Sequence, residues 1–281
     1  MNIKNKLNIR RLLAVILAAV LLCTAGCSAV KDIVKDNLGQ TAPQTVRIMF
    51  REGSTVADIA ALLESEGVCT AADFMAQANN PQNLEKYGFS VDNVADRAFV
   101  LEGYLFPDTY DFYLGESAEA AISRFLKNTA SKLDGEIKAR CAELGYSLDE
   151  ILTIASVIQG EASDPVNMKK VASVVHNRLS SDHLPKLECD CATFYLRRSV
   201  KPYVDEARYA QLIDLYNTYN FKGLPAGAIN NPGIEAINAA LYPDETEYYF
   251  FASDDNGVYY YGKTYEEHLA YCKEAGIIGS D

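Results

Sequence analysis

The clearest periodic pattern in the chain runs from Ser147 to Arg178 and predicts two consecutive helices. Ser147 and Glu150 have the spacing of a capping box, so the first helix begins at Leu148. Apolar side chains then recur at helical intervals and form one stripe, at Ile151, Ile154, Ala155 and Ile158. The next position on this stripe is Glu161, which places a carboxyl group at the end of an apolar face.

The second helix follows at once. Asp164 is a favourable N-cap and Pro165 suits the first helical position. The apolar face of this helix comprises Val171, Val174, Val175 and Leu179, with Asn177 and Arg178 beside it. Glu161 therefore lies at a helix junction, where burial would keep its carboxyl group protonated and suit it to general acid catalysis. The alternative is a solvated glutamate on a frayed last turn, because ordinary ion pairs also perturb carboxylates.

Residues 45–96 predict a small module with one strand and two helices. The alternation from Thr45 to Phe50 is typical of a strand. Thr55 and Asp58 cap a helix that ends at Gly67, and a further helix runs from about residue 70 to 78. A module this short needs neighbouring structure to bury its apolar face, and the turn-rich residues 79–96 connect it to the rest.

The remaining chain mixes helices, loops and one hairpin, which together predict an α+β fold class. The aromatic segment from Phe99 to Tyr110 could line a sugar site, but its composition favours a core. The other expected elements are helices at 118–144, 234–241 and 264–273, irregular chain at 179–199, a loop rich in hydrogen-bonding groups at 216–233, and a hairpin that pairs 248–252 with 258–261. Thr264 with Glu267 is predicted to cap the last of these helices.

The charge of the chain excludes one class of partner. The formal net charge is −12, and the first 26 residues carry basic side chains but no acidic one, so the remainder is more acidic still. A body this acidic has no electrostatic footprint for nucleic acid. It has none for a broad anionic membrane surface either.

Residues 1–27 have the pattern of an export signal. Basic residues precede the apolar run from Leu12 to Leu22, and Ala25-Gly26-Cys27 resembles the bacterial lipobox, in which the cysteine is lipidated. The position three before Cys27 is Thr24 and not the usual Leu, so an uncleaved membrane anchor is the alternative. Counted from Leu12 to Gly26, the apolar stretch is roughly 15 residues long, which is shorter than a spanning helix needs. Either prediction places the body at the extracytoplasmic face of a bacterial cytoplasmic membrane, on a polar tether of residues 28–44.

No cofactor and no metal site is predicted. Cys189 and Cys191 form a C-x-C pair, and none of the three histidines has ligand spacing to it. The cysteines beyond the leader are odd in number, and their simplest role is as small apolar residues with at most one disulfide.

Several segments, in a fixed order, resemble the endolytic murein transglycosylase (YceG-like) family between about residues 45 and 272. They are VRIMFREGSTVADI at 46–59, LEGYLFPDTY at 101–110, ASVIQGEA at 155–162, VASVVHNRL at 171–179, YNTY at 216–219, GLPAG at 223–227 and NPG at 231–233. The resemblance implies a small LysM-like subdomain with its connector at 45–96 and a mixed α/β catalytic domain at 97–275.

The resemblance also implies an activity. Members of this family cleave the β-1,4 bond between N-acetylmuramic acid and N-acetylglucosamine inside nascent glycan strands and leave 1,6-anhydro ends. Glu161 would be the one catalytic carboxylate, since the substrate supplies its own nucleophile, unlike the paired carboxylates of most glycosidases. Partners would be peptidoglycan strands and penicillin-binding proteins that polymerise glycan. The substrate-binding candidates are Glu102, Tyr104, Asn177, Arg178, Asp190, Thr193, Asn217, Thr218, Tyr219, Leu224, Pro225 and Asn231.

Two positions depart from the pattern of the family. Gln159 stands where the family often has a second carboxylate, and if that position carried the acid the chain would be inactive. The segment Leu187 to Thr193 resembles the LQSDxT stretch with an uncertain register, in which Asp190 is the preferred match for the acidic position.

Rival hypotheses stay open. The chain could be a non-catalytic peptidoglycan-binding lipoprotein, in which case replacing Glu161 would change no activity. It could be a hydrolase that leaves reducing ends, with Glu102 or Asp190 as the second carboxylate. It could be a solute-binding lipoprotein without murein affinity. The polar candidates named above could each be structural hydrogen-bonding residues instead.

Overall fold

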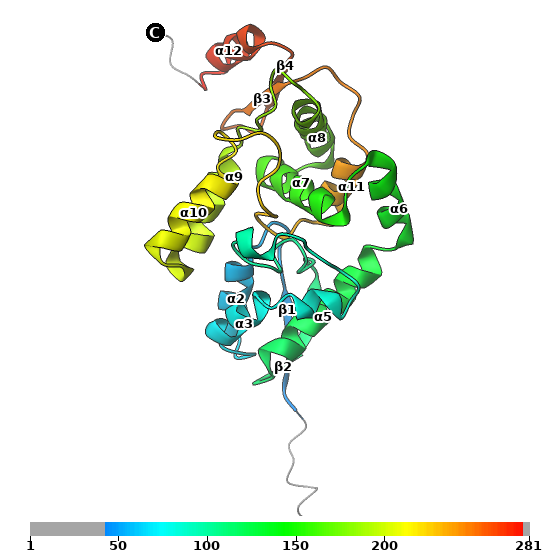
Figure 1. Cartoon of the computed structure of the whole chain (residues 1–281), viewed down its shortest axis with the longest axis vertical. Coiled ribbons are helices and arrows are strands. Elements are labelled where there is room, and N and C mark those ends of the chain that lie inside the picture. Colours follow the sequence, from blue (N-terminus) through cyan, green and yellow to red (C-terminus); the bar gives the residue numbers. More distant parts are fainter. Residues whose placement is uncertain (1–42, 278–281) are drawn as a thin grey trace, which may run out of the picture. The chain divides into compact units, whose positions relative to one another are not determined.

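Three helices pack against one another in the part of the molecule that carries Glu161: α7 (Leu148–Glu161), α8 (Pro165–Leu179) and α11 (Ile234–Leu241) (Figure 1). The capping box predicted for α7 is confirmed. The Ser147 side chain accepts a hydrogen bond from the Glu150 amide, and the Glu150 carboxylate accepts one from the Ser147 amide. The predicted cap of α8 is confirmed too, because the Asp164 side chain accepts from the amides of Val166 and Asn167. The buried faces of these three helices form part of the hydrophobic core.

The computed structural model describes residues 43–277. The predicted leader at 1–27 with Cys27 lies outside the described residues, as does the tether at 28–44 except for its last two residues. From Val46 onward the chain forms one unit. No helix among residues 43–277 combines the length and the apolar character needed to cross a membrane.

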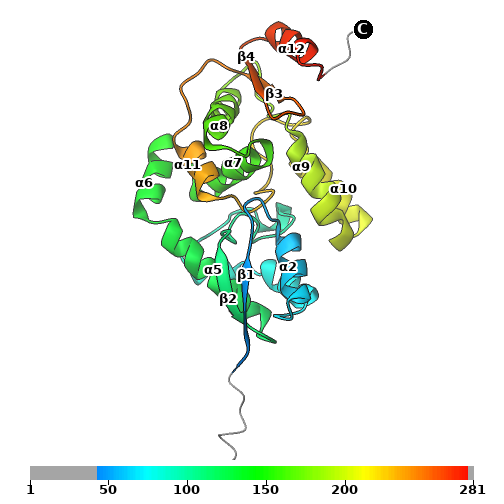
Figure 2. The same cartoon turned by 180° about the vertical axis from the view of Figure 1, so that it is seen from behind.

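The N-terminal strand β1 (Thr45–Met49) forms a two-stranded sheet with β2 (Thr109–Tyr113), as Figure 2 shows. The helices α2 (Val56–Ser65) and α3 (Ala71–Ala78) pack together, and the capping box at Thr55 is confirmed. The ring of Phe50 lies 4.9 Å from that of Phe125, which belongs to the next long helix. The strand therefore completes its sheet and core with residues beyond 96, and the predicted LysM likeness and domain division stay predictions.

The single helix predicted at 118–144 is wrong. Two helices occupy this stretch, α5 (Ala118–Lys132) and α6 (Gly135–Leu144). The Asp134 side chain accepts hydrogen bonds from the amides of Glu136 and Ile137, so it caps a new helix. A short helix α4 (Gln82–Glu85) and a 3₁₀ turn η1 (Val94–Asp96) lie within the predicted connector.

The irregular chain predicted at 179–199 is also partly wrong. A helix α9 (Asp190–Tyr195) continues into a π-helical turn η2 (Leu196–Val200) and a 3₁₀ turn η3 (Lys201–Tyr203), and α10 (Glu206–Tyr216) follows. The buried residues of this segment, Ala192, Tyr195, Leu196, Ser199 and Val200, do recur at helical spacing, so the prediction overlooked a pattern that the sequence contains.

The C-terminal hairpin is confirmed, one or two residues later than predicted. Strands β3 (Phe250–Ser253) and β4 (Tyr259–Gly262) pair in antiparallel fashion, with Phe250 opposite Gly262. The last helix α12 (Tyr265–Glu274) packs on both strands, and the Thr264 cap is confirmed by its bond from the Glu267 amide. With short sheets beside many helices, the α+β class predicted from the sequence is confirmed. The five cysteines within residues 43–277 are all free.

Candidate active site

Glu161 is the last residue of α7 and is half-buried. The eight residues from Ile151 to Ile158 of this helix are all buried, so the helix is fixed on every side before it reaches the carboxylate. Tyr259 of the hairpin donates from its hydroxyl to the Glu161 backbone oxygen at 2.7 Å. Burial raises the pKa of the Glu161 carboxyl above its ordinary value, although hydrogen bonds from the Cys191 thiol and backbone amide lower it in part.

Gly160 explains how Cys191 reaches Glu161. A Cβ atom at position 160 would lie 2.9 Å from the Cys191 Cβ, closer than real side chains approach. The missing side chain therefore lets α9 pack directly against the end of α7. This close approach places the thiol and the amide of Cys191 against the carboxyl group of Glu161.

Glu161 lines a pocket of about 370 Å³. The volume lies within the range of small-ligand sites. Residues 187–190 form one part of its wall and residues 249–253 of the hairpin form another. The remaining residues that line it are Glu161, Arg178, Tyr219, Tyr265, His268, Cys272 and Ile277. The pocket, hereafter the aromatic pocket, thus combines titratable groups with ring faces that can pack on sugars.

Asp190 supplies a second carboxylate to the aromatic pocket. The hydroxyl of Tyr219 donates to it at 3.2 Å, and the Tyr219 ring is 43% exposed, so it can meet a ligand. Burial is the largest cause that raises the pKa of Tyr219, to about 12, and the nearby Asp190 carboxylate adds to it. Asp190 also contributes to the raised pKa of Glu161.

Arg178 joins the two walls of the aromatic pocket. Its guanidinium donates to the backbone oxygens of Tyr249 and Lys186 and to the carboxylate of Glu188, at 2.6, 2.8 and 2.8 Å. It also lies over the Phe250 ring, 5.0 Å from the centroid. Glu188 has a φ of 53° and is the one non-glycine residue with positive φ in the described part of the chain. Backbone strain of this kind persists where surrounding contacts hold it, as Arg178 does here.

The structure brings four of the predicted site residues together in the aromatic pocket: Glu161, Arg178, Asp190 and Tyr219. Six others do not line it: Asn177, Thr193, Asn217, Thr218, Leu224 and Pro225. Thr218 is fully buried and bonds the backbone of Cys189, and Asn177 donates to the carbonyls of Thr246 and Tyr248. These contacts favour the structural alternative for both residues.

Glu102, Tyr104 and Asn231 lie in the core and not in the aromatic pocket. The Glu102 carboxyl accepts hydrogen bonds from the Val56 amide at 3.0 Å, the Tyr195 hydroxyl at 3.0 Å and the Asn231 side-chain amide at 2.9 Å. Burial raises the pKa of Glu102 to about 8. This fully bonded carboxyl joins distant segments and has no access to a substrate.

Gln159 has a structural contact that accounts for its presence. Its side-chain oxygen accepts a hydrogen bond from the Gly233 amide at 3.0 Å, just before α11. A carboxylate could accept the same bond, so the departure from the family pattern keeps the local geometry. Gln159 does not line the aromatic pocket.

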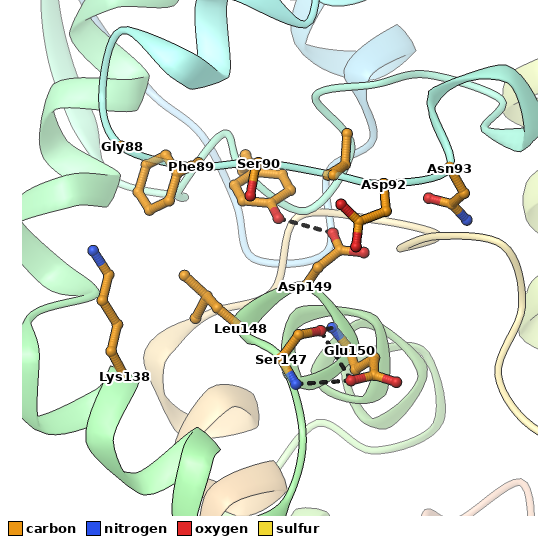
Figure 3. A pocket seen from close by; sticks show the side chains of 12 residues that line it. Gly88, Phe89, Ser90, Asp92, Asn93, Lys138, Ser147, Leu148, Asp149 and Glu150 are labelled. Atoms are coloured by element: carbon orange, nitrogen blue, oxygen red, sulfur yellow. Dashed lines mark hydrogen bonds between the residues drawn. The ribbon is translucent and has the colours of Figure 1, made fainter.

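A further hollow, of about 530 Å³, lies at the opposite end of α7 (Figure 3). Asp149 faces it, accepts a hydrogen bond from the Tyr104 hydroxyl at 2.8 Å and forms an ion pair with Arg97. Burial raises the pKa of Asp149, but Arg97 counteracts this. A carboxylate with a buried arginine partner is a structural ion pair, so we do not place chemistry there.

The sequence did not identify the hairpin wall or Cys191 as parts of the site. The hairpin itself was predicted, but its contact with the end of α7 joins residues far apart in the sequence, which local patterns do not reveal. Cys191 had one local indication, its C-x-C spacing, but that spacing was weighed only as a metal motif. Among residues 43–277, no cluster of three or more His, Cys, Asp or Glu side chains could hold a metal ion.

An α+β fold that holds a half-buried glutamate at an aromatic-lined pocket has the groups that a glycan-binding site requires. A family model described as YceG-like family matches residues 26–274. The chain belongs to this family, which confirms the resemblance found in the sequence.

Relatives agree with this assignment. The chain is similar to an endolytic murein transglycosylase of Bacillus subtilis (strain 168), with 34% identity over 233 residues, 79% of this chain and 63% of the relative. A protein of the same name from Streptococcus pneumoniae is 28% identical over 83% of this chain and 41% of the relative. The chain thus spans less than two thirds of either protein. The crystal structure of a YceG-like protein from Listeria monocytogenes superimposes with a TM-score of 0.68, at 29% identity, over 86% of this chain and 80% of that one.

Proposed function

We propose that the chain is an endolytic lytic transglycosylase that cleaves the β-1,4 bond between N-acetylmuramic acid and N-acetylglucosamine within glycan strands. One observation carries the proposal. The Glu161 carboxyl is half-buried at the aromatic pocket, its pKa is raised by burial, and no Lys, Arg or His forms an ion pair with it among the described residues. Burial favours the protonated form of a carboxyl in this setting, and that form can transfer its proton to a leaving oxygen.

In the proposed reaction, protonated Glu161 donates its proton to the glycosidic oxygen as the bond from that oxygen to C1 of the muramyl residue breaks. The resulting carboxylate takes the proton of the C6 hydroxyl of the same muramyl residue, and O6 bonds to C1. The product is a 1,6-anhydro end, and Glu161 is protonated again. No water enters the products, so a single carboxylate can serve both proton transfers.

The names of the relatives support peptidoglycan as the substrate, and the aromatic rings of the pocket suit the apolar faces of pyranose rings. With that substrate, the protein would work at the extracytoplasmic face of the bacterial cytoplasmic membrane. Lipidated Cys27 or an N-terminal helix would anchor it there, beside penicillin-binding proteins that polymerise glycan.

The test is a digestion of purified murein with the full chain and with its Glu161→Gln variant, followed by mass spectrometry of the products. We expect internal cleavage to 1,6-anhydro ends by the unmodified chain and none by the variant. Cleavage that persists in the variant would contradict the role of Glu161. Binding without cleavage by either protein would leave the non-catalytic peptidoglycan-binding alternative.

A second candidate function is a hydrolase that leaves reducing ends. Asp190 favours it, because this carboxylate lines the same pocket and could activate a water on the opposite face of the sugar. Glu102 cannot do so, because its carboxyl is buried in the core. The same mass spectra separate the two reactions, since a hydrolytic product is heavier than an anhydro product by one water.

A further inference from the structure

A second hollow, of about 560 Å³, borders the end of α7 from another side. It lies between the turn that follows β1, at residues 51–55, and the α9–η2 segment, and Gly160, Ile229 and Asn230 also line it. Cys191 belongs to this hollow and also hydrogen-bonds to Glu161. The hollow and the aromatic pocket therefore meet at the Gly160–Glu161 end of α7, with Glu161 lining one and Gly160 the other.

Two arginines line this hollow beside two acids, Glu52 and Asp58, and we call it the arginine hollow. Arg51 and Arg198 both line it and are exposed, and neither forms a salt bridge within residues 43–277. The acidic Asp58 is occupied as a cap, since its carboxylate accepts from the Thr55 amide and hydroxyl at 3.0 and 2.8 Å. The carboxylate of Glu52 packs against Gly233. Guanidinium groups without a partner suit a carboxylate ligand, which they bind with paired hydrogen bonds.

The arginine hollow also has groups that suit a sugar. Phe194 lines it with its side chain 54% exposed, and Arg197 lies over its ring, 5.0 Å from the centroid, so at most one ring face is left for the apolar face of a pyranose. Asn230 is only 6% exposed and lines the hollow, and its buried side-chain oxygen has no hydrogen-bond donor. Its side-chain nitrogen is already bonded to the Ser156 carbonyl at 2.8 Å. Buried acceptors are nearly always paired, so this oxygen beside the hollow is an acceptor that the described residues leave unpaired.

We propose that the arginine hollow binds a carboxylate-bearing sugar of the glycan strand, on the side of the cleaved bond opposite to the aromatic pocket. This inference rests on the proposed function. A strand that occupies both hollows passes the Glu161 carboxyl at the ridge between them, which is the arrangement that cleavage inside a strand requires. The carboxylate has two possible sources: the lactyl group of a muramyl residue that carries no stem peptide, or the stem peptide itself where its amide bond has consumed the lactyl carboxyl.

The test measures binding and not cleavage, so it uses the full chain with Glu161→Gln throughout. Arg51→Gln and Arg198→Gln are combined in one variant. The matched control combines Lys127→Gln and Lys273→Gln, which removes the same charge from exposed positions that line neither hollow. Three probes are titrated by calorimetry: peptide-free murein strands, strands with intact stem peptides, and chitohexaose, which has no carboxylate.

We expect the arginine variant to bind carboxylate-bearing strands about 10-fold more weakly and chitohexaose unchanged, whereas the lysine control binds all probes as the parent does. Weakening with peptide-free strands assigns the lactyl carboxylate, and weakening only with intact strands assigns the peptide. Equal weakening in the control, equal weakening with chitohexaose, or no weakening would overturn the inference.

The two proposals can fail separately. If binding is selective and depends on the arginines but the unmodified chain cleaves no murein, the transglycosylase proposal is contradicted and the binding site is supported. If the chain cleaves murein to anhydro ends but binding does not depend on the arginines, the transglycosylase proposal is supported and the binding site is contradicted.

Discussion

The two ends of helix α7 both carry a carboxyl group that faces a hollow, and burial raises the pKa of both. At the first end, Asp149 (Figure 3) pairs with the buried Arg97 and accepts a bond from Tyr104. At the other end, Glu161 has hydrogen bonds from Cys191 but forms no ion pair within residues 43–277. The hollow beside Asp149 is larger than the aromatic pocket but slightly smaller than the arginine hollow at the Glu161 end, so size does not distinguish the two ends.

The difference lies in what each carboxyl group can do with a proton. An arginine beside a carboxylate favours its charged form, and the pair then serves to fix two segments. Burial without a cation favours the protonated form of a carboxyl group, and that form can donate a proton. Pairing, more than burial or a nearby hollow, therefore distinguishes a structural acid from a catalytic candidate.

Exchanging each acid for its amide gives the largest contrast. Glu161→Gln should lower the rate of murein cleavage at least about 10³-fold and leave the melting temperature unchanged, because the acid is lost and the shape is kept. Asp149→Asn should change the rate less than about 3-fold and lower the melting temperature, because Arg97 loses its charge partner. Product analysis and thermal melts of both variants measure this. Equal loss of activity in folded Asp149→Asn would mean that the two ends do not differ in this way.

Removing Arg97, the cation that pairs with Asp149, should have the next largest effect, and this effect is on stability. Arg97→Met leaves the Asp149 carboxylate buried and without its ion pair, which should lower the free energy of unfolding by about 3 kcal/mol. Denaturant unfolding measures this free energy. Arg47→Met serves as the control, since the Arg47–Asp111 pair is exposed and should contribute less than about 1 kcal/mol. A similar loss in both variants would show that burial does not decide the value of the pair.

A third buried carboxyl, Glu102, adds a pH dependence to the comparison. Its folded pKa of about 8 exceeds the ordinary value of 4.5, so the folded state holds a proton that the unfolded state releases. Its contribution to stability is therefore full below pH 4.5 and is lost as the pH rises to about 8, by on the order of 5 kcal/mol. Glu102→Gln should remove this pH dependence, because the amide can still accept from Val56 and Asn231 while it donates to Tyr195. Melts at pH 6 and pH 9 test this, and an unchanged pH dependence in the variant would contradict it.

The smallest expected effect concerns the hydrogen bonds of Glu161. The Cys191 thiol lowers the Glu161 pKa, so Cys191→Ala should raise that pKa further. Because the acid must be protonated, the basic limb of the rate profile should move to higher pH. Cys191→Ser keeps a donor and serves as the control. A shift of the limb to lower pH in the alanine variant would contradict the assigned contact.

Local rules predicted a large part of this molecule. The caps at Ser147, Asp164 and Thr264 depend on residues within one turn, and each was found where the sequence placed it. The position of Glu161 at the end of an apolar helix followed from the same rules. The cap at Asp134 was equally local and was missed, because apolar positions continue through the break.

The rest of the site depends on contacts that the sequence does not contain. Asn231 looks like a ligand-binding loop residue, yet its side-chain oxygen accepts from the amides of Gly103 and Leu105. Arg178 was expected near a substrate, but only the structure shows that it joins two walls of the pocket. The β3–β4 hairpin and α9 are distant from α7 in the sequence but contact its Glu161 end in the fold. These long-range contacts decide which residues surround Glu161.

The bonds of Glu102 also bear on the time course of folding. Its partners Val56, Tyr195 and Asn231 lie 46, 93 and 129 residues away along the chain. Contacts over such separations close slowly and late. A ribosome makes residue 102 long before residue 231, so the amino-terminal strand and helices cannot reach their final bonding until most of the chain has been synthesised. For this protein, the order of synthesis is not the order in which its parts are completed.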